Sequence, residues 1–206
     1  MIGRLRCDAL FSLSLLLSLV LVAQVPPAMG KDSMADDSND SEDEVQLDAE
    51  LSNSCSTCTS VPNLNGEAEF EQEVASGGTV KEGKIQAQVM IPIPNSLGID
   101  ATTARTASVI LELSNTNPNA PYATCTLAFK KVTGKKNGAK ATYVLKLQTK
   151  LKGTTHVSGK KQSGTCTLDA IDLNVQPTDT AIITANGLDV LSGTFGGEDE
   201  NEDEDN

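Results

Sequence analysis

The sequence predicts an all-β fold: an antiparallel β-sandwich, immunoglobulin-like in general plan, with a closed β-barrel as the alternative. Apolar residues recur at every second position through much of the chain, which is typical of strands with one buried face. Turn-forming Gly, Asn and Pro residues separate these stretches. No stretch has the apolar stripe of an amphipathic helix, so we expect seven or eight strands, as in sandwich domains.

The alternation is clearest in the stretch KIQAQVMIPI. Ile85, Ala87 and Val89 share one face of it, and Lys84 and Gln86 lie on the other. The same pattern predicts further strands around Cys125 and Cys166 and at residues 67–74, 105–113, 141–151, 170–175, 180–186 and 188–195. The core should be aliphatic, because the chain has no tryptophan and few other aromatic residues.

Composition divides the chain into four parts. Residues 1–30 have the pattern of a secretory signal peptide, with Arg4 and Arg6 before the apolar run 10–22 and small residues after it. A membrane span needs about 20 apolar residues and this run is shorter, so we expect a secreted or periplasmic protein with no span after cleavage. The other parts are an acidic disordered linker at 31–64, the β-sandwich domain at 65–195 and an acidic disordered tail at 196–206.

The charge of the chain is segregated along it. The net charge is -12, but residues 81–193 hold 13 basic and seven acidic side chains. Residues 31–80 hold 13 acids and one lysine, and the tail holds seven acids and no base. The sequence therefore predicts a basic domain between two acidic arms.

The basic residues of the domain are almost all lysines in one region. Between Leu113 and Leu168 there are ten lysines and no acid. We expect a basic patch that binds a polyanion, such as an acidic polysaccharide or a cell-envelope polymer, with ordinary solvation of hairpin tips as the alternative. This region has no arginine and few aromatic rings, which argues against nucleic acid as its ligand. The candidate polyanion-binding residues are Lys130, Lys131, Lys135, Lys136, Lys146, Lys150, Lys152, Lys160 and Lys161.

Four cysteines follow the signal segment, and an even number in an exported protein indicates disulfides. Cys125 and Cys166 occur in the same tetrapeptide, TCTL, and the strand period points both into the core. If the chain crosses between sheets after residue 152, the two can face each other across the core, so a Cys125–Cys166 bond is favoured. Cys55 and Cys58 are expected to form a small local disulfide, although pairing with the other two cysteines stays open.

Other candidate sites are weaker. The CSTC motif has the spacing of redox and zinc sites, but the one histidine, His156, stands in a lysine-rich loop. Four glutamates, at positions 67, 69, 71 and 73, share one strand face, where lysines of a neighbouring strand should oppose them. No calcium loop or catalytic motif occurs, so we expect no metal, no cofactor and no catalytic residue.

The sequence thus favours a secreted, non-enzymatic β-sandwich that acts as a structural or binding module of the cell surface or matrix. One alternative is an exported redox or metal-handling protein that uses Cys55 and Cys58. Another is a hydrolase whose carboxylates meet only in the fold, and a pocket with converging carboxylates would favour it. Oligomeric state is not indicated by any pattern in the chain.

Overall fold

A computed structural model describes residues 43–196 of the chain, except 54–57, 116, 118–119 and 136–137. All the described residues belong to one unit of the chain, Asn39–Asn206. The predicted signal peptide, the first part of the linker and all but Gly196 of the tail lie outside the described residues.

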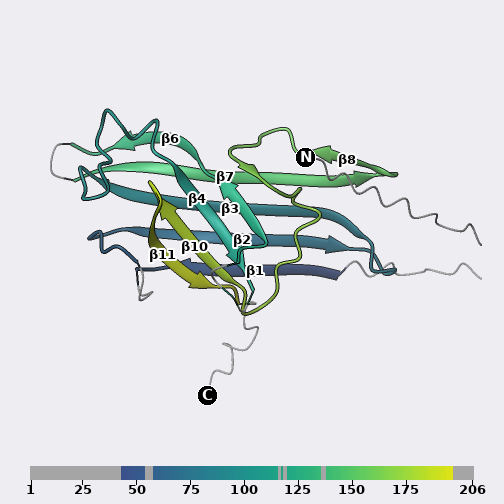
Figure 1. Cartoon of the computed structure of the whole chain (residues 1–206). Helices are drawn as coiled ribbons and strands as arrows, with labels where there is room; N and C mark the ends of the chain where they lie inside the picture. Colours follow the sequence, from purple (N-terminus) through teal and green to yellow (C-terminus); the bar gives the residue numbers. More distant parts are fainter. Residues whose placement is uncertain (1–42, 54–57, 116, 118–119, 136–137, 197–206) are drawn as a thin grey trace, which may run out of the picture. The chain divides into compact units, whose positions relative to one another are not determined.

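The described strands form two antiparallel sheets packed on each other, which confirms the predicted β-sandwich (Figure 1). They do not form the closed barrel that was the alternative, and no helix occurs among the described residues. Sheet A has the order β1-β2-β3-β7-β6, with β8 paired to the far end of β7. Sheet B has the order β11-β10-β4-β5-β9, and its strands cross those of sheet A obliquely (Figure 1).

The strand bounds show that sheet A is built from the longer strands. Sheet A contains β1 (Asp43–Leu51), β2 (Asn65–Val74), β3 (Val80–Ile93), β6 (Ala128–Thr133), β7 (Ala139–Lys152) and β8 (Thr155–Ser158). Sheet B contains β4 (Val109–Ser114), β5 (Ala123–Thr126), β9 (Thr165–Cys166), β10 (Thr180–Ala185) and β11 (Leu188–Thr194).

The core lies between the sheets and is mainly aliphatic, as predicted. Every second residue of β3 from Gly83 to Ile93 is buried, and the inward residues of β4 and β10 pack opposite them. Tyr143 on β7 is the largest fully buried side chain, and its hydroxyl donates a hydrogen bond to the carbonyl of Ala104 (2.7 Å). Burial raises the pKa of Tyr143 to about 12, so this hydroxyl remains a donor at physiological pH.

The structure corrects the start of the domain. Residues 43–51, which the sequence assigns to the disordered linker, form β1 and pair along their whole length with β2. The acids hide a period of two, because Leu47, Ala49 and Leu51 alternate with them and are buried. Average composition concealed this pattern, and the domain boundary at residue 65 is therefore wrong.

Strand β1 also joins the two sheets at one edge. The backbone of Asp48 bridges Gly196, and Ser52, the residue after β1, bridges Ser192 of β11. The backbones approach closely here, since a Cβ added at Gly193 would meet the carbonyl oxygen of Glu50. Glycine at this position therefore allows the first and last strands to lie side by side.

The chain passes from sheet B to sheet A at the first TCTL sequence, residues 124–127. Strand β5 belongs to sheet B and β6 to sheet A, and the single buried residue between them, Leu127, makes the switch. Cys125 and Cys166 form a disulfide, as favoured from the sequence, with Cα atoms 4.0 Å apart. However, β5 and β9 are adjacent strands of sheet B, so the bond joins neighbours and does not span the core.

Some predicted strands are absent or shorter. Residues 170–175, expected to form a strand, have no strand structure, although Ala170, Ile171 and Leu173 are buried. Buried and exposed residues do alternate here, but the segment packs on the core without pairing with a neighbouring strand. The strand predicted at 105–113 begins at Val109.

Candidate functional site

The outward side chains of β1 and β2 form an acidic zone on sheet A. The register places Glu50 opposite Glu67 and Asp48 opposite Glu69, so carboxylates face carboxylates across the two strands. This confirms that the four glutamates of β2 share a face, but acids flank them on one side. The acidic zone consists of Glu44, Asp48, Glu50, Glu67, Glu69, Glu71 and Glu73.

Strand β3 follows on the other side of β2 and carries mostly amides. Gln86 donates a hydrogen bond to Glu69 (2.8 Å), and Gln88 donates one to Glu67 (3.5 Å). Lys84 is the one lysine of β3 that faces the acidic zone in this register, and it pairs closely with Glu71 and lies 3.9 Å from Glu69. The sequence predicts several lysines opposite the glutamates, and strand β3 supplies one, Lys84.

Beyond β3, the same face becomes basic. Lys146 of β7 lies opposite Gln86, and Lys150 lies opposite Glu82, with which it forms a close ion pair. Strand β6 adds Lys130 and Lys131 at a bulge in its pairing with β7. Charge therefore changes sign across about five strands of one sheet, and we call this surface the divided face.

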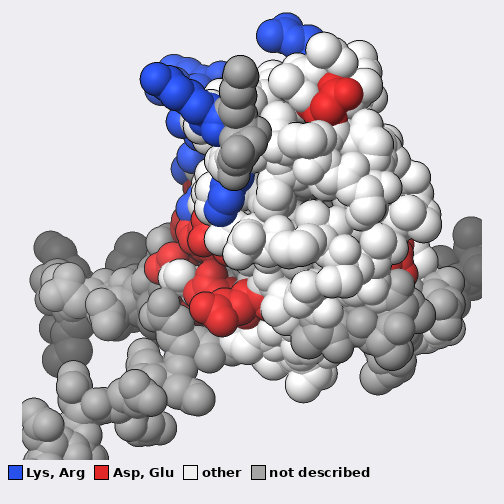
Figure 2. Space-filling model, turned by 90° about the vertical axis from the view of Figure 1, so that its left-hand side faces the viewer, with Lys and Arg blue, Asp and Glu red and all other residues white. Residues whose placement is uncertain are grey.

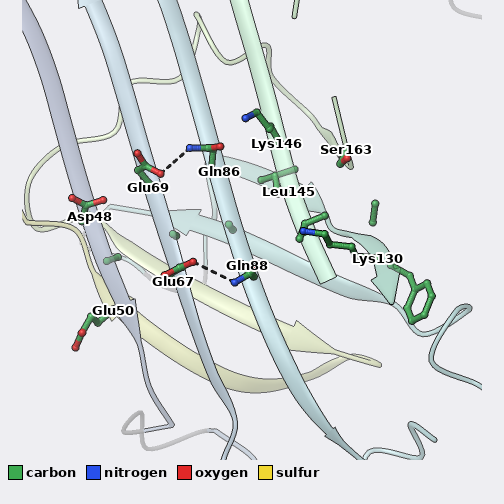
Figure 3. Close-up of a pocket in the computed structure, with 16 residues that line it drawn as sticks. Asp48, Glu50, Glu67, Glu69, Gln86, Gln88, Lys130, Leu145, Lys146 and Ser163 are labelled. Atoms are coloured by element: carbon green, nitrogen blue, oxygen red, sulfur yellow. Dashed lines mark hydrogen bonds between the residues drawn. The ribbon is translucent and has the colours of Figure 1, made fainter. Parts of the chain in front are cut away.

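A groove of about 610 Å³ lies on the divided face, between its acidic and basic sides. Figure 3 shows Asp48, Glu50, Glu67 and Glu69 along one side of it. The basic side is lined by Lys130 and Lys146, with Phe129, Ala128 and Val144 beside them. Two glutamines on β3 lie between the two sides (Figure 3).

Two carboxyls of the acidic zone have pKa values shifted in opposite directions. A hydrogen bond with Glu71 raises the pKa of Glu69, and burial adds to the rise. Burial also raises the pKa of Glu71, but hydrogen bonds with Glu69 and Lys84 and the charge of Lys84 outweigh it, so the net pKa is lowered. Glu69 is therefore the first of the two to take a proton.

The predicted polyanion-binding lysines lie on neighbouring elements of sheet A. Figure 2 shows basic side chains gathered along one flank, directly above a band of acidic ones. Lys130, Lys131 and Lys135 lie on β6 and the turn after it, and Lys146, Lys150 and Lys152 share the exposed face of β7. Lys160 and Lys161 are exposed in the loop after β8, and Lys136 lies outside the described residues.

These lysines are not equally available. Lys150 is engaged by Glu82, and the charge of Lys146 acts on Glu71. Among the described residues, no carboxylate lies within 4.0 Å of the ammonium groups of the remaining lysines of this set. We call these remaining residues the lysine flank: Lys130, Lys131, Lys135, Lys152, Lys160 and Lys161.

His156 is not the isolated loop residue that the sequence indicates. It lies on β8, and its Nδ1 is 3.4 Å from an oxygen of Asp169 and 3.8 Å from one of Asp172. The ligand atoms of all three lie within 4.8 Å of one another, and all three side chains are exposed. The two carboxylates can balance the imidazole when it is protonated.

The cysteine pair of the CSTC motif is only partly described. Cys58 is disulfide-bonded, and Cys55 lies outside the described residues. Because Cys125 and Cys166 bond to each other, the alternative pairings with Cys55 or Cys58 are wrong. A redox role for the motif stays a prediction. The described residues contain no helix long and apolar enough to cross a membrane.

In comparisons with known proteins, no family model, curated protein or solved structure matches the chain.

Sequence reasoning found the lysines and the β2 glutamates but missed how they are combined. The missing signal was the alternation of acids with Leu47, Ala49 and Leu51 in β1. Strand order was the other missing element, because nothing local in the chain shows that β3 pairs with β7.

Proposed function

We propose that this protein is a secreted, non-enzymatic binding module, and that its lysine flank binds a polyanion such as an acidic polysaccharide. The observation that carries the proposal is the set of exposed lysines with no carboxylate partner among the described residues. Ammonium groups held on neighbouring strands raise the local concentration of an anionic polymer and release its counterions on contact.

The geometry of the flank supports an extended ligand over a small one. Lys130 and Lys131 lie on β6, and Lys152 lies near the far end of β7, where β8 replaces β6 as its neighbour. A row of single charges along a sheet edge contacts repeated anionic groups, whereas it offers a small molecule no enclosed site.

The proposal is tested by binding of the protein to a sulfated polysaccharide at low salt. Lys130→Gln with Lys131→Gln should weaken binding about tenfold, and the loss should shrink as salt is added. The matched control is Lys84→Gln with Lys150→Gln, which removes the same charge from lysines that already have carboxylate partners. An equal loss in both variants, or no binding by the unmodified protein, would contradict the proposal.

One observation favours a second candidate, a hydrolase. The groove brings carboxylates together, and Asp48 lies directly opposite Glu69, whose pKa is raised. Directly opposed residues on antiparallel strands have Cβ atoms about 5 Å apart, a separation within reach of the acid and nucleophile of a retaining glycosidase. Hydrolysis of a soluble polysaccharide that disappears in Glu69→Gln would establish this candidate, and absence of hydrolysis would leave the binding module.

A further inference from the structure

The divided face is self-complementary. Its acidic side comprises β1 and β2, its basic side comprises β7 and β6, and β3 lies between them. If a second copy is turned by 180° about an axis parallel to β3, its β7 lies over β2 of the first copy and its β6 lies over β1. The same contact is then made twice, as in an isologous dimer.

The residues that such an arrangement brings together have opposite charges. Rows along the strands are kept by this rotation, so Glu69 of one copy lies opposite Lys146 of the other, and Glu73 lies opposite Lys150. In the same rows, Glu50 of β1 lies opposite Ala128 of β6, and the bulge that carries Lys130 and Lys131 begins two residues further along β6. The perpendicular twofold axis would instead place acids on acids, so the charges select one orientation.

Charges at the outer edges of this face have no partner within the described chain. Asp48 and Glu50 on β1 have no lysine or arginine within 4.0 Å among the described residues, and Lys130 and Lys131 on β6 have no carboxylate. The pairs that are formed lie towards the middle, where Lys84 meets Glu71 and Lys150 meets Glu82. The middle of the face is thus neutralised within one copy, and its edges keep exposed charges that an outside partner of opposite charge can meet.

We propose that two copies of this chain associate face to face through the divided face of sheet A, with the acidic side of each on the basic side of the other. The groove of about 610 Å³ admits the long lysine and glutamate side chains of the second copy. Phe129, Val144 and Ala128 at the groove supply a small apolar contact beside the charges.

The size of the face sets the expected strength. Four rows of side chains on five strands cover about 650 Å² per copy at ordinary strand spacings. This is slightly less than the about 800 Å² per partner of a standard stable interface, so the dimer should be weak and in exchange with the monomer. Because its pairs are ionic and partly exposed, association should weaken as salt rises.

The test uses two charge-reversed variants. One converts the acidic side to basic, by Asp48→Lys, Glu50→Lys and Glu67→Lys; the other converts the basic side to acidic, by Lys130→Glu, Lys131→Glu and Lys146→Glu. At low salt the purified protein should sediment as a monomer–dimer mixture. Each variant alone should have a dimer dissociation constant at least tenfold higher, and an equimolar mixture should restore dimer as a heterodimer, resolved by native mass spectrometry.

Two results would overturn the proposal. In the first, the mixture of variants associates no better than either variant alone. In the second, the unmodified protein is monomeric at low salt and at concentrations near 1 mM, and this measurement does not depend on whether a variant folds. The acidic-to-basic variant keeps every lysine of the flank. It should therefore retain polysaccharide binding whether or not it dimerises, and the two proposals fail separately.

Discussion

The two sheets of this sandwich have similar inner faces and different outer faces. Inward, both present aliphatic residues such as Ile85 on β3 and Leu111 on β4. Outward, β4, β5 and β10 of sheet B carry threonine and isoleucine. Among the paired residues of these three strands, Glu112 is the one charged residue that points outward. Sheet A instead carries the divided face. Since both inner faces are explained by the packing of the core, the charges on the outer face of sheet A are the better guide to function.

Removing the disulfide of sheet B should have the largest effect on stability, because the fold that carries both outer faces depends on it. Cys125→Ala with Cys166→Ala opens a link between residues 41 positions apart. The chain-entropy model gives a loss of about 4 kcal/mol for a loop of this length. Cys55→Ala with Cys58→Ala should cost much less, and urea unfolding compares the two. Equal losses would contradict the prediction.

Paired truncations should separate inner from outer faces in both sheets. Ile85→Ala and Leu111→Ala each create a cavity beside a fully buried side chain and should cost about 2–5 kcal/mol. Their outward neighbours, in Gln86→Ala and Glu112→Ala, should change stability by less than about 1 kcal/mol. Chemical denaturation of the four variants measures this. A large loss at Gln86 alone would mean that the divided face also stabilises sheet A.

The smallest effect should appear in the pH dependence of stability that comes from the paired carboxyls of sheet A. Burial raises the pKa of Glu82, but hydrogen bonds from Lys150 and Gln148 and the charge of Lys150 outweigh it, so its net pKa is lowered, as is that of Glu71. A carboxyl with a lowered folded pKa stabilises the fold fully above its unfolded value and loses that contribution as pH falls through the folded value. The contribution is therefore present above about pH 4.5 and lost below it.

Glu71→Gln with Glu82→Gln should flatten this part of the stability curve between about pH 5 and 3, by at most about 1 kcal/mol per ion pair. Urea unfolding at several pH values measures the slope, and Glu112→Gln in sheet B serves as the control. If the double variant loses stability on acidification as steeply as the unmodified protein, the ion pairs of the divided face do not contribute.

Local pattern was enough to predict the elements with one buried face. Strands β3 and β7 were found because apolar residues fill their inward positions without a break, from Ile85 to Ile93 and from Ala141 to Leu147. Strand β1 was missed because its outward residues are acids that lower the average hydrophobicity, and residues 170–175 were overpredicted because burial without pairing gives the same alternation.

The candidate site was predictable only in pieces. The lysines and the β2 glutamates are visible in the sequence, but their placement on one sheet depends on the pairing of β3 with both β2 and β7. The partners of His156 were equally hidden, because Asp169 and Asp172 approach it through the turn of a segment that the alternation assigned to a strand. Contacts set by long-range pairing leave no mark within a local window of sequence.

The bridge between Asp48 and Gly196 has a consequence for how the chain matures during synthesis. The edge of β1 that faces β11 cannot be paired until the last strand has emerged, so a nascent chain carries an open edge for nearly the whole of its translation. Open edges invite pairing with other chains. The carboxylates of β1 and β2 repel the same edge of a neighbouring nascent chain, and so they would protect the chain until β11 arrives.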